Sequence, residues 1–273
     1  MQFRAAVRKV PLFVLWACLA GAQPLRAQET FPYRLDPWLE GGLAASGVAL
    51  FVGAVAVYQG QEPFTPGEIA ALDAEDVNGF DRSATENWST AAITASDILV
   101  WSLLAAPVGL AIATPGSRQS WTLGAMYGEV LLLNNGLMQL IKGVTDRTRP
   151  YAYNDDPDIP DELLFEVSAK RSFPSSHTAN AFAAAVFLST TYARLHPGSS
   201  ARTWVWAGSL TAAGTVGFLR YQAGKHFPTD VIAGAVLGSA IGYLVPKLHE
   251  MESVDVMVAP VGDGTAIGLS WRY

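Results

Sequence analysis

Six long runs of apolar and small residues dominate this chain of 273 residues. Runs of this length favour α-helices, and roughly 17–25 apolar residues are enough for a helix to cross a bilayer. Half of the residues are hydrophobic and only 15% are charged, whereas average soluble domains carry about 25% charged residues. We therefore expect an all-α fold, a six-helix membrane-type bundle, with a very apolar soluble bundle as the alternative. The expected helices are Gly41–Tyr58, Ser89–Thr114, Trp121–Ile141, His177–Leu195, Trp204–Leu219 and Val231–Leu248.

Residues 1–27 have the pattern of a secretory signal peptide. Basic residues (Arg4, Arg8 and Lys9) precede the apolar core Val10–Ala20, and small residues follow it. An uncleaved membrane anchor is the alternative. Export would place the protein in the bacterial cell envelope. We expect a signal peptide at 1–27, a helical domain at 28–250 and a tail at 251–273.

The tail differs in pattern from the rest of the chain. Val254–Pro260 and Thr265–Tyr273 alternate weakly between apolar and polar residues, and Gly262-Asp263-Gly264 separates them. This pattern predicts a short C-terminal β-hairpin, whose role stays open.

Three polar stretches lie where apolar runs end or begin: Lys142–Pro150, Phe173–His177 and Arg220–Asp230. Together they contain cations, hydroxyls, two histidines and a carboxylate. Phosphoryl transfer depends on positioning the phosphate and stabilising its negative charge. The stretches therefore indicate an anion site with a nucleophile and an acid. The formal net charge of −6 argues against nucleic acid as a partner.

The anion ligands can be named from residue type. Lys142, Arg149 and Arg220 can supply positive charge, and the planar fork of arginine suits phosphate oxygens. Ser175 and Ser176 precede an expected helix, so their hydroxyls and the free N–H groups there would point at an anion.

His226 and His177 fit the roles of nucleophile and general acid. Asp230 follows His226 by four residues and can fix the tautomer of its ring. Pro228 between them places His226 in a turn and Asp230 near a helix start, which favours His226 as the nucleophile. Each residue taken alone is more often structural, but the chain has only four histidines and two fall in these stretches.

These motifs resemble those of the type 2 phosphatidic acid phosphatase superfamily, which includes bacterial acid phosphatases and vanadium haloperoxidases. The family's first motif is matched by Lys142, Arg149 and Pro150, the second by Pro174, Ser175 and His177, and the third by Arg220, His226 and Asp230. Two positions depart from it: Ser176 replaces a glycine and Leu219 replaces a serine.

The resemblance implies a metal-independent phosphatase without a cofactor. It implies His226 as nucleophile, His177 as general acid, and Lys142, Arg149, Ser175 and Arg220 as phosphate ligands. Neither departure touches these residues, so we expect an active enzyme. The apolar helices favour a lipid phosphomonoester or diphosphate, of the undecaprenyl diphosphate, phosphatidate, phosphatidylglycerophosphate or lipid A type. A soluble periplasmic acid phosphatase of broad specificity and a vanadate-dependent haloperoxidase are the alternatives.

The expected topology contains a conflict. A cleaved signal and six crossings would put the motifs on the cytoplasmic side. However, Arg118, Arg194 and Arg202 lie in the opposite loops, so the positive-inside rule places the motifs outside. An uncleaved N-terminus, a first run that does not cross, or a wholly periplasmic bundle would each resolve it. We expect membrane association, with the site facing the periplasm from the inner membrane. The oligomeric state stays open.

Overall fold

The computed structural model describes residues 31–251, 253–261 and 264–272, and the expected signal peptide at 1–27 lies outside them. The described residues contain eight α-helices, which confirms the all-α expectation. Two are short: α3 (Pro66–Ala70) and α6 (Asp161–Leu164). The six long helices are α2 (Pro37–Tyr58), α4 (Thr90–Ala113), α5 (Ser117–Thr145), α7 (Ser176–Leu195), α8 (Ala201–Gln222) and α9 (Pro228–His249).

Local signals in the sequence set several helix starts. The side chains of Asp36 and Ser89 accept hydrogen bonds from backbone N–H groups of the first turns of α2 and α4, as N-caps do. Pro228 occupies the first position of α9, where its missing N–H costs nothing. The third run is longer than expected, because α5 begins at Ser117 and ends at Thr145. Lys142 is therefore part of that helix and does not follow it.

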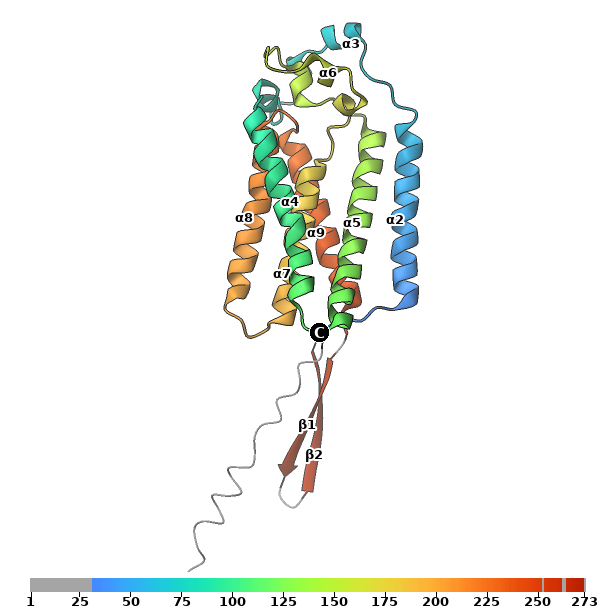
Figure 1. The fold of residues 1–273 in the computed structure, drawn as a ribbon, viewed down its shortest axis with the longest axis vertical. Helices are drawn as coiled ribbons and strands as arrows, with labels where there is room; N and C mark the ends of the chain where they lie inside the picture. Colours follow the sequence, from blue (N-terminus) through green and yellow to red (C-terminus); the bar gives the residue numbers. More distant parts are fainter. Residues whose placement is uncertain (1–30, 252, 262–263, 273) are drawn as a thin grey trace, which may run out of the picture. The chain divides into compact units, whose positions relative to one another are not determined.

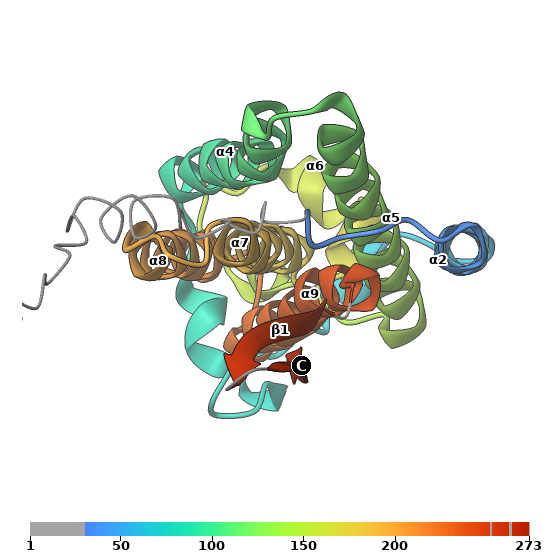
Figure 2. The same cartoon turned by 90° about the horizontal axis from the view of Figure 1, so that it is seen from below.

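The long helices run side by side, and α7 lies in the middle of the bundle (Figures 1 and 2). Its buried residues are small: Ala179, Ala181 and Ala183 are fully buried. At Gly234 of α9, an added Cβ would lie 2.5 Å from the backbone oxygen of Ser175, the N-cap of α7, and at Gly238 it would lie 2.1 Å from that of Ala179 within α7. These two glycines therefore let α9 contact the α7 backbone directly.

Asparagines inside the bundle bond to each other. Asn134 Nδ2 donates to Asn180 Oδ1 at 2.7 Å, and Asn180 Nδ2 donates to Asn135 Oδ1 at 3.2 Å. These contacts place the side chains of Asn134 and Asn135 against α7, as a buried polar group requires.

The outer surface of the bundle is apolar. Trp101, Ile112 and Trp204 are more than two-thirds exposed. Three helices (α2, α4 and α9) are long and apolar enough to cross a membrane. Large apolar groups on such helices are stable in contact with lipid, and the chain is a membrane protein.

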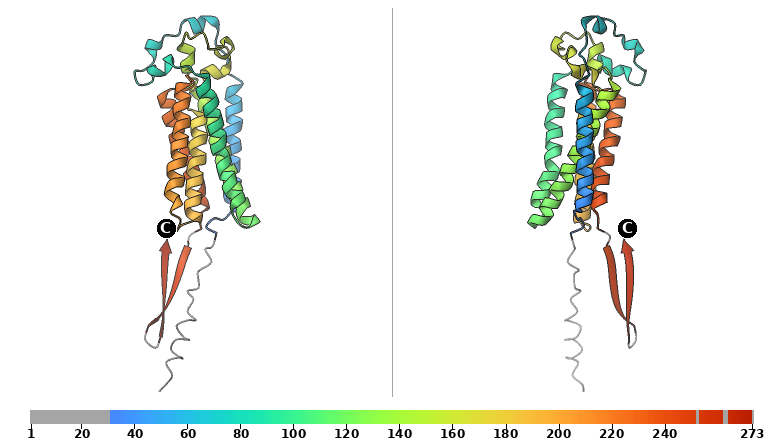
Figure 3. Two further views of the ribbon diagram at one scale, coloured as in Figure 1. Left: turned by 60° about the vertical axis from the view of Figure 1, so that its left-hand side comes forward. Right: turned by 90° about the vertical axis from the view of Figure 1, so that its right-hand side faces the viewer.

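Short elements cover one end of the bundle (Figure 3). They include the 3₁₀ helices η1 (Ala74–Asp76), η2 (Arg82–Glu86), η3 (Pro150–Tyr153) and η4 (Val167–Lys170). The segment 151–171, between the first two motifs, is therefore partly helical. Beyond the bundle, β1 (Ser253–Val261) pairs antiparallel with β2 (Gly264–Arg272).

Candidate active site

Four long helices bring the three motifs to one end of the bundle. The C-terminal ends of α5 and α8 and the N-terminal ends of α7 and α9 lie there together (Figure 1). Lys142 comes from α5, Ser176 and His177 from α7, Arg220 from α8 and Asp230 from α9. All eight predicted site residues therefore lie at this end, with Arg149, Ser175 and His226 in the connecting segments.

The ring of His226 is buried between a carboxylate and a guanidinium. Its Nδ1 lies 3.5 Å from Asp230 Oδ2, and its Nε2 lies 3.4 Å from Nη1 of Arg149. Burial lowers the pKa of His226 well below its usual value, and the charges of Arg149 and Lys142 lower it further. The ring is therefore neutral at pH 7 and keeps a lone pair for attack.

Asp230 is held by several donors. Its Oδ2 accepts from the hydroxyl of Ser172 at 2.5 Å and from the backbone N–H of Phe227 at 2.9 Å. Its Oδ1 accepts from Arg147 at 2.6 Å. The side chain is fully buried. With its position fixed in this way, the carboxylate can orient the His226 ring and stabilise its cationic form.

Carbonyl oxygens hold two of the predicted cations in place. Nζ of Lys142 donates to the backbone oxygens of Arg171 and Ser172, at 2.8 Å and 3.2 Å. The guanidinium of Arg149 donates to those of Ser168 and Lys225, at 2.8 Å and 3.0 Å. These bonds leave further donors on both side chains, which an arriving anion can use.

Asp97 on α4 joins two other predicted residues. Its Oδ1 lies 2.9 Å from Nε2 of His177 and 3.3 Å from Nη1 of Arg220. Sequence reasoning missed Asp97 as a site residue, because its partners are 80 and 123 residues away. The general-acid candidate and one phosphate-ligand candidate thus share a carboxylate.

The two serines differ in their surroundings. Ser175 is fully buried, and its hydroxyl caps α7 and accepts from Thr178 at 2.9 Å. The hydroxyl of Ser176 has no hydrogen-bond partner among the described residues.

Arg147 is a site residue that sequence reasoning missed. It donates to Asp230 at 2.6 Å, to Asp81 at 2.8 Å and to the hydroxyl of Thr229 at 2.7 Å, and its guanidinium lies over the ring of Phe227. Both carboxylates are fully buried. Its position within the first motif was the available signal, but its partners are 66 and 83 residues away.

Lys225 was also missed. Its ammonium lies 5.0 Å and 4.6 Å from the ring centres of Trp88 and Tyr151. Burial, and then the neighbouring charges of Arg149 and Arg220, lower the pKa of Lys225 to about 8. Lys225 therefore adds a further positive charge beside His226 in the chain.

Comparison with known proteins finds similarity in the region of the three motifs. The PAP2 superfamily model matches residues 123–253, which contain all three motifs. This match covers just under half of the chain, which is therefore similar to the PAP2 superfamily over the residues that hold the three motifs. The resemblance drawn from the motifs is thereby confirmed.

Curated PAP2-like relatives are distant. The chain is 29% identical to the lipid A 4′-phosphatase of Bacteroides thetaiotaomicron over 38% of its length and 43% of the relative's. It is 32% identical to the undecaprenyl-diphosphatase of Sulfolobus acidocaldarius, over 41% and 48% of the two chains. It is 33% identical to the decaprenylphosphoryl-5-phosphoribose phosphatase of Mycolicibacterium smegmatis, over 45% and 57%. The chain thus spans about half the length of these relatives.

The solved structure of a transmembrane PAP2 type phosphatidylglycerolphosphate phosphatase from Bacillus subtilis is also similar to the chain. The match has a TM-score of 0.40 at 20% identity and covers 86% of this chain and 92% of the other.

Proposed function

We propose that this protein is a metal-independent phosphatase that hydrolyses a lipid phosphomonoester or diphosphate through a phosphohistidine. The observation that carries the proposal is the His226 ring, which is buried and neutral, with Nδ1 toward Asp230 and Nε2 toward Arg149. A neutral ring with its free nitrogen beside a cation suits attack on a phosphate.

The reaction has two steps. Nε2 of His226 attacks phosphorus, the bond from phosphorus to the leaving oxygen breaks, and His177 gives its proton to that oxygen. His177 then takes a proton from water, the water oxygen attacks the phosphohistidine, and inorganic phosphate leaves with His226 neutral again. Asp230 stabilises the charged ring between the steps. Lys142, Arg149 and Arg220 stabilise the charge on the phosphoryl oxygens, with the hydroxyls of Ser175 and Ser176 and the backbone N–H of Ser176.

An apolar groove beside the site supports a lipid substrate. It has a volume of about 590 Å³ and lies between α4 and α5, where Trp101, Leu104 and Tyr127 line it. Asn180, three residues after His177 on α7, also lines it. A phosphate held at His177 could therefore extend an apolar chain into this groove. The names of the curated relatives, which describe phosphatases of lipid A and of prenyl carriers, also favour a lipid.

The decisive experiment is phosphate release by detergent-purified protein in the presence of EDTA. A panel of lipid phosphates and p-nitrophenyl phosphate are offered side by side. We expect release from one lipid class far above the soluble ester, and no release by His226→Ala. Hydrolysis by His226→Ala at a near wild-type rate would refute the mechanism, and equal release from lipid and ester would favour a broad acid phosphatase.

We further propose that the site faces the periplasm from the inner membrane. Arg118, Arg194 and Arg202 lie near the end of the bundle opposite the site, where the positive-inside rule predicts cytoplasm. Cysteine labelling in intact cells tests this, because the chain has a single cysteine, Cys18. In a Cys18→Ser background, an impermeant maleimide should label exposed Glu86→Cys at the site end and leave Gly198→Cys unlabelled. The reverse labelling would place the site in the cytoplasm.

A further inference from the structure

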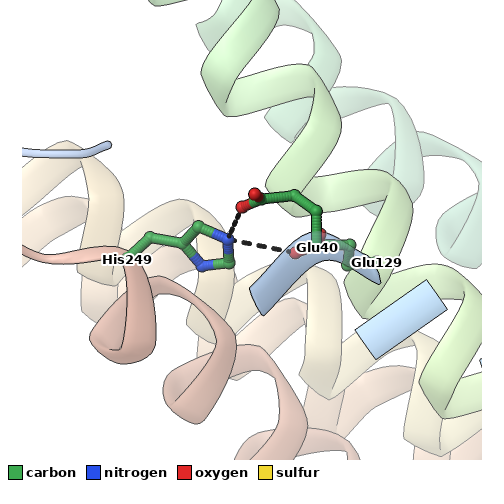
Figure 4. A group of neighbouring side chains, drawn as sticks. All are labelled: Glu40, Glu129 and His249. Carbon is green, nitrogen blue, oxygen red and sulfur yellow. Dashed lines mark hydrogen bonds and ion pairs between the residues drawn. The ribbon is translucent and has the colours of Figure 1, made fainter. Parts of the chain in front are cut away.

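Three ionisable side chains converge at the other end of the bundle, away from the active site. Glu40 comes from the first turn of α2, Glu129 from α5, and His249 is the last residue of α9 (Figure 4). Nε2 of His249 lies 2.9 Å from Glu40 Oε1 and 3.3 Å from Glu129 Oε2. His249 is 2% exposed and Glu129 is 9% exposed.

The described residues do not supply a hydrogen-bond donor for every acceptor in this cluster. Nδ1 of His249 lies 2.8 Å from the backbone oxygen of Val245, which can only accept, so Nδ1 carries a proton. Nε2 then carries at most one more proton, and Glu40 is its nearer acceptor. Oε2 of Glu129 is buried and accepts no hydrogen bond from the described residues. A buried carboxylate oxygen without a donor is costly, so the two carboxylates need more positive charge beside them than one histidine supplies.

We propose that Glu40, Glu129 and His249 bind a divalent transition-metal cation of the Zn²⁺ class. Their ligand atoms all lie within 4.8 Å of one another. A tetrahedral ion with bonds of about 2.1 Å holds its ligand atoms roughly 3.4 Å apart, so small side-chain movements complete the site. One nitrogen and two carboxylates suit zinc better than calcium or magnesium, which prefer oxygen ligands.

The second contact of His249 supports the same assignment. Metal-binding histidines usually donate their other ring N–H to a carbonyl or carboxylate, which fixes the tautomer and aims the free nitrogen at the ion. The bond from Nδ1 to Val245 does this, and Nε2 points at both carboxylates (Figure 4).

This site is structural and separate from the catalytic one. Asp230 and His249 are 19 positions apart on α9, which corresponds to about 28 Å along a helix. The ion joins the start of α2 and the end of α9 to α5. Because α2 lies at the edge of the bundle beside α5 (Figure 2), the ion fastens the outermost helix to the interior.

The test measures metal content and not only activity. The full chain, purified in detergent with a histidine-free tag, is stripped with EDTA, reloaded with Zn²⁺, desalted and analysed by mass spectrometry. We expect about one zinc per chain and a higher thermal unfolding midpoint, because zinc at 100 times its Kd shifts the folding equilibrium about 100-fold. Wild-type protein that retains no zinc and gains no stability would overturn the proposal and leave an ion triad of a protonated histidine and two glutamates.

Variants locate the ion. Glu129→Gln and His249→Gln should lose the zinc and the stabilisation, whereas the exposed control Glu86→Gln should keep both. His226→Ala should also keep the zinc, which separates this site from the catalytic histidines. Zinc retained at wild-type stoichiometry by Glu129→Gln would refute the assignment. Phosphate release by wild-type protein in EDTA is scored separately, since it tests the catalytic proposal alone.

Discussion

Arg147→Met removes the guanidinium that bridges two fully buried carboxylates. Arg147 donates to Asp81 at 2.8 Å and to Asp230 at 2.6 Å, and methionine keeps much of its length but none of its donors. Breaking a buried ion pair from one side costs about 3–5 kcal/mol, because the other charge stays buried. The Arg147 side chain is 26% exposed, so water offsets part of the loss and we take the lower value, about 3 kcal/mol.

That loss converts into a measurable shift. For a protein of this size, 1 kcal/mol moves the thermal unfolding midpoint by about 2–4 °C, so we expect a decrease of about 6–12 °C. Tryptophan fluorescence during heating in detergent measures it. The matched control is Arg202→Met, because exposed Arg202 donates to a single carbonyl, that of Pro197, which is worth about 1 kcal/mol or less.

Activity gives a second readout of the same variant. At temperatures where Arg147→Met stays folded, phosphate release should fall about tenfold or less, because Oδ2 of Asp230, which faces His226, keeps its donors Ser172 and Phe227. Equal midpoint shifts in Arg147→Met and Arg202→Met would show that the buried carboxylates do not depend on Arg147, and the reasoning would fail.

Two further predictions concern titration and packing. Burial and nearby cations lower the pKa of His226, so its ring should stay neutral as the pH falls through 6.5 and take up a proton only well below that pH. The protonation is measured by ¹⁵N NMR of the imidazole, with the His226 signals assigned by comparison with His226→Gln. A titration midpoint at pH 6.5 would contradict this prediction. Gly238→Ala places a Cβ 2.1 Å from the backbone oxygen of Ala179 and should cost about 1–3 kcal/mol. Gly214→Ala, with nothing within 4 Å, should instead stabilise by up to about 1 kcal/mol; thermal midpoints that move in the same direction would contradict the pair.

The sequence predicted the helices and the location of the site for physical reasons that act locally. Long apolar runs specify helices. Ser175 marks a helix start in the second motif, and Pro228 marks one in the third. Because polar motifs occur where apolar runs end, the predicted residues reach one end of the bundle.

The missed contacts depend on tertiary structure. Asp97 meets His177 across 80 residues, and Asp81 meets Arg147 across 66. No sequence pattern near Asp97 or Asp81 marks either acid as the partner of a distant residue, because the local composition already accounts for the secondary structure of each segment. Glu129 likewise meets His249, which lies 120 positions further along the chain, so the sequence around Glu129 does not name its partner.

The close contact between α7 and α9 limits which residues can be substituted in one part of the molecule but not in another. The backbone N–H of Ser175 donates to the carbonyl of Asp230 at 3.0 Å, and the α9 glycines leave no room for a side chain between the two helices. The parts that carry out the proposed chemistry therefore tolerate little change. The groove wall on α4 has no such constraint at Trp101, which is 71% exposed. Mutation can reshape the apolar side of the pocket, and with it the choice of lipid under the proposed function, while the reaction centre stays as it is.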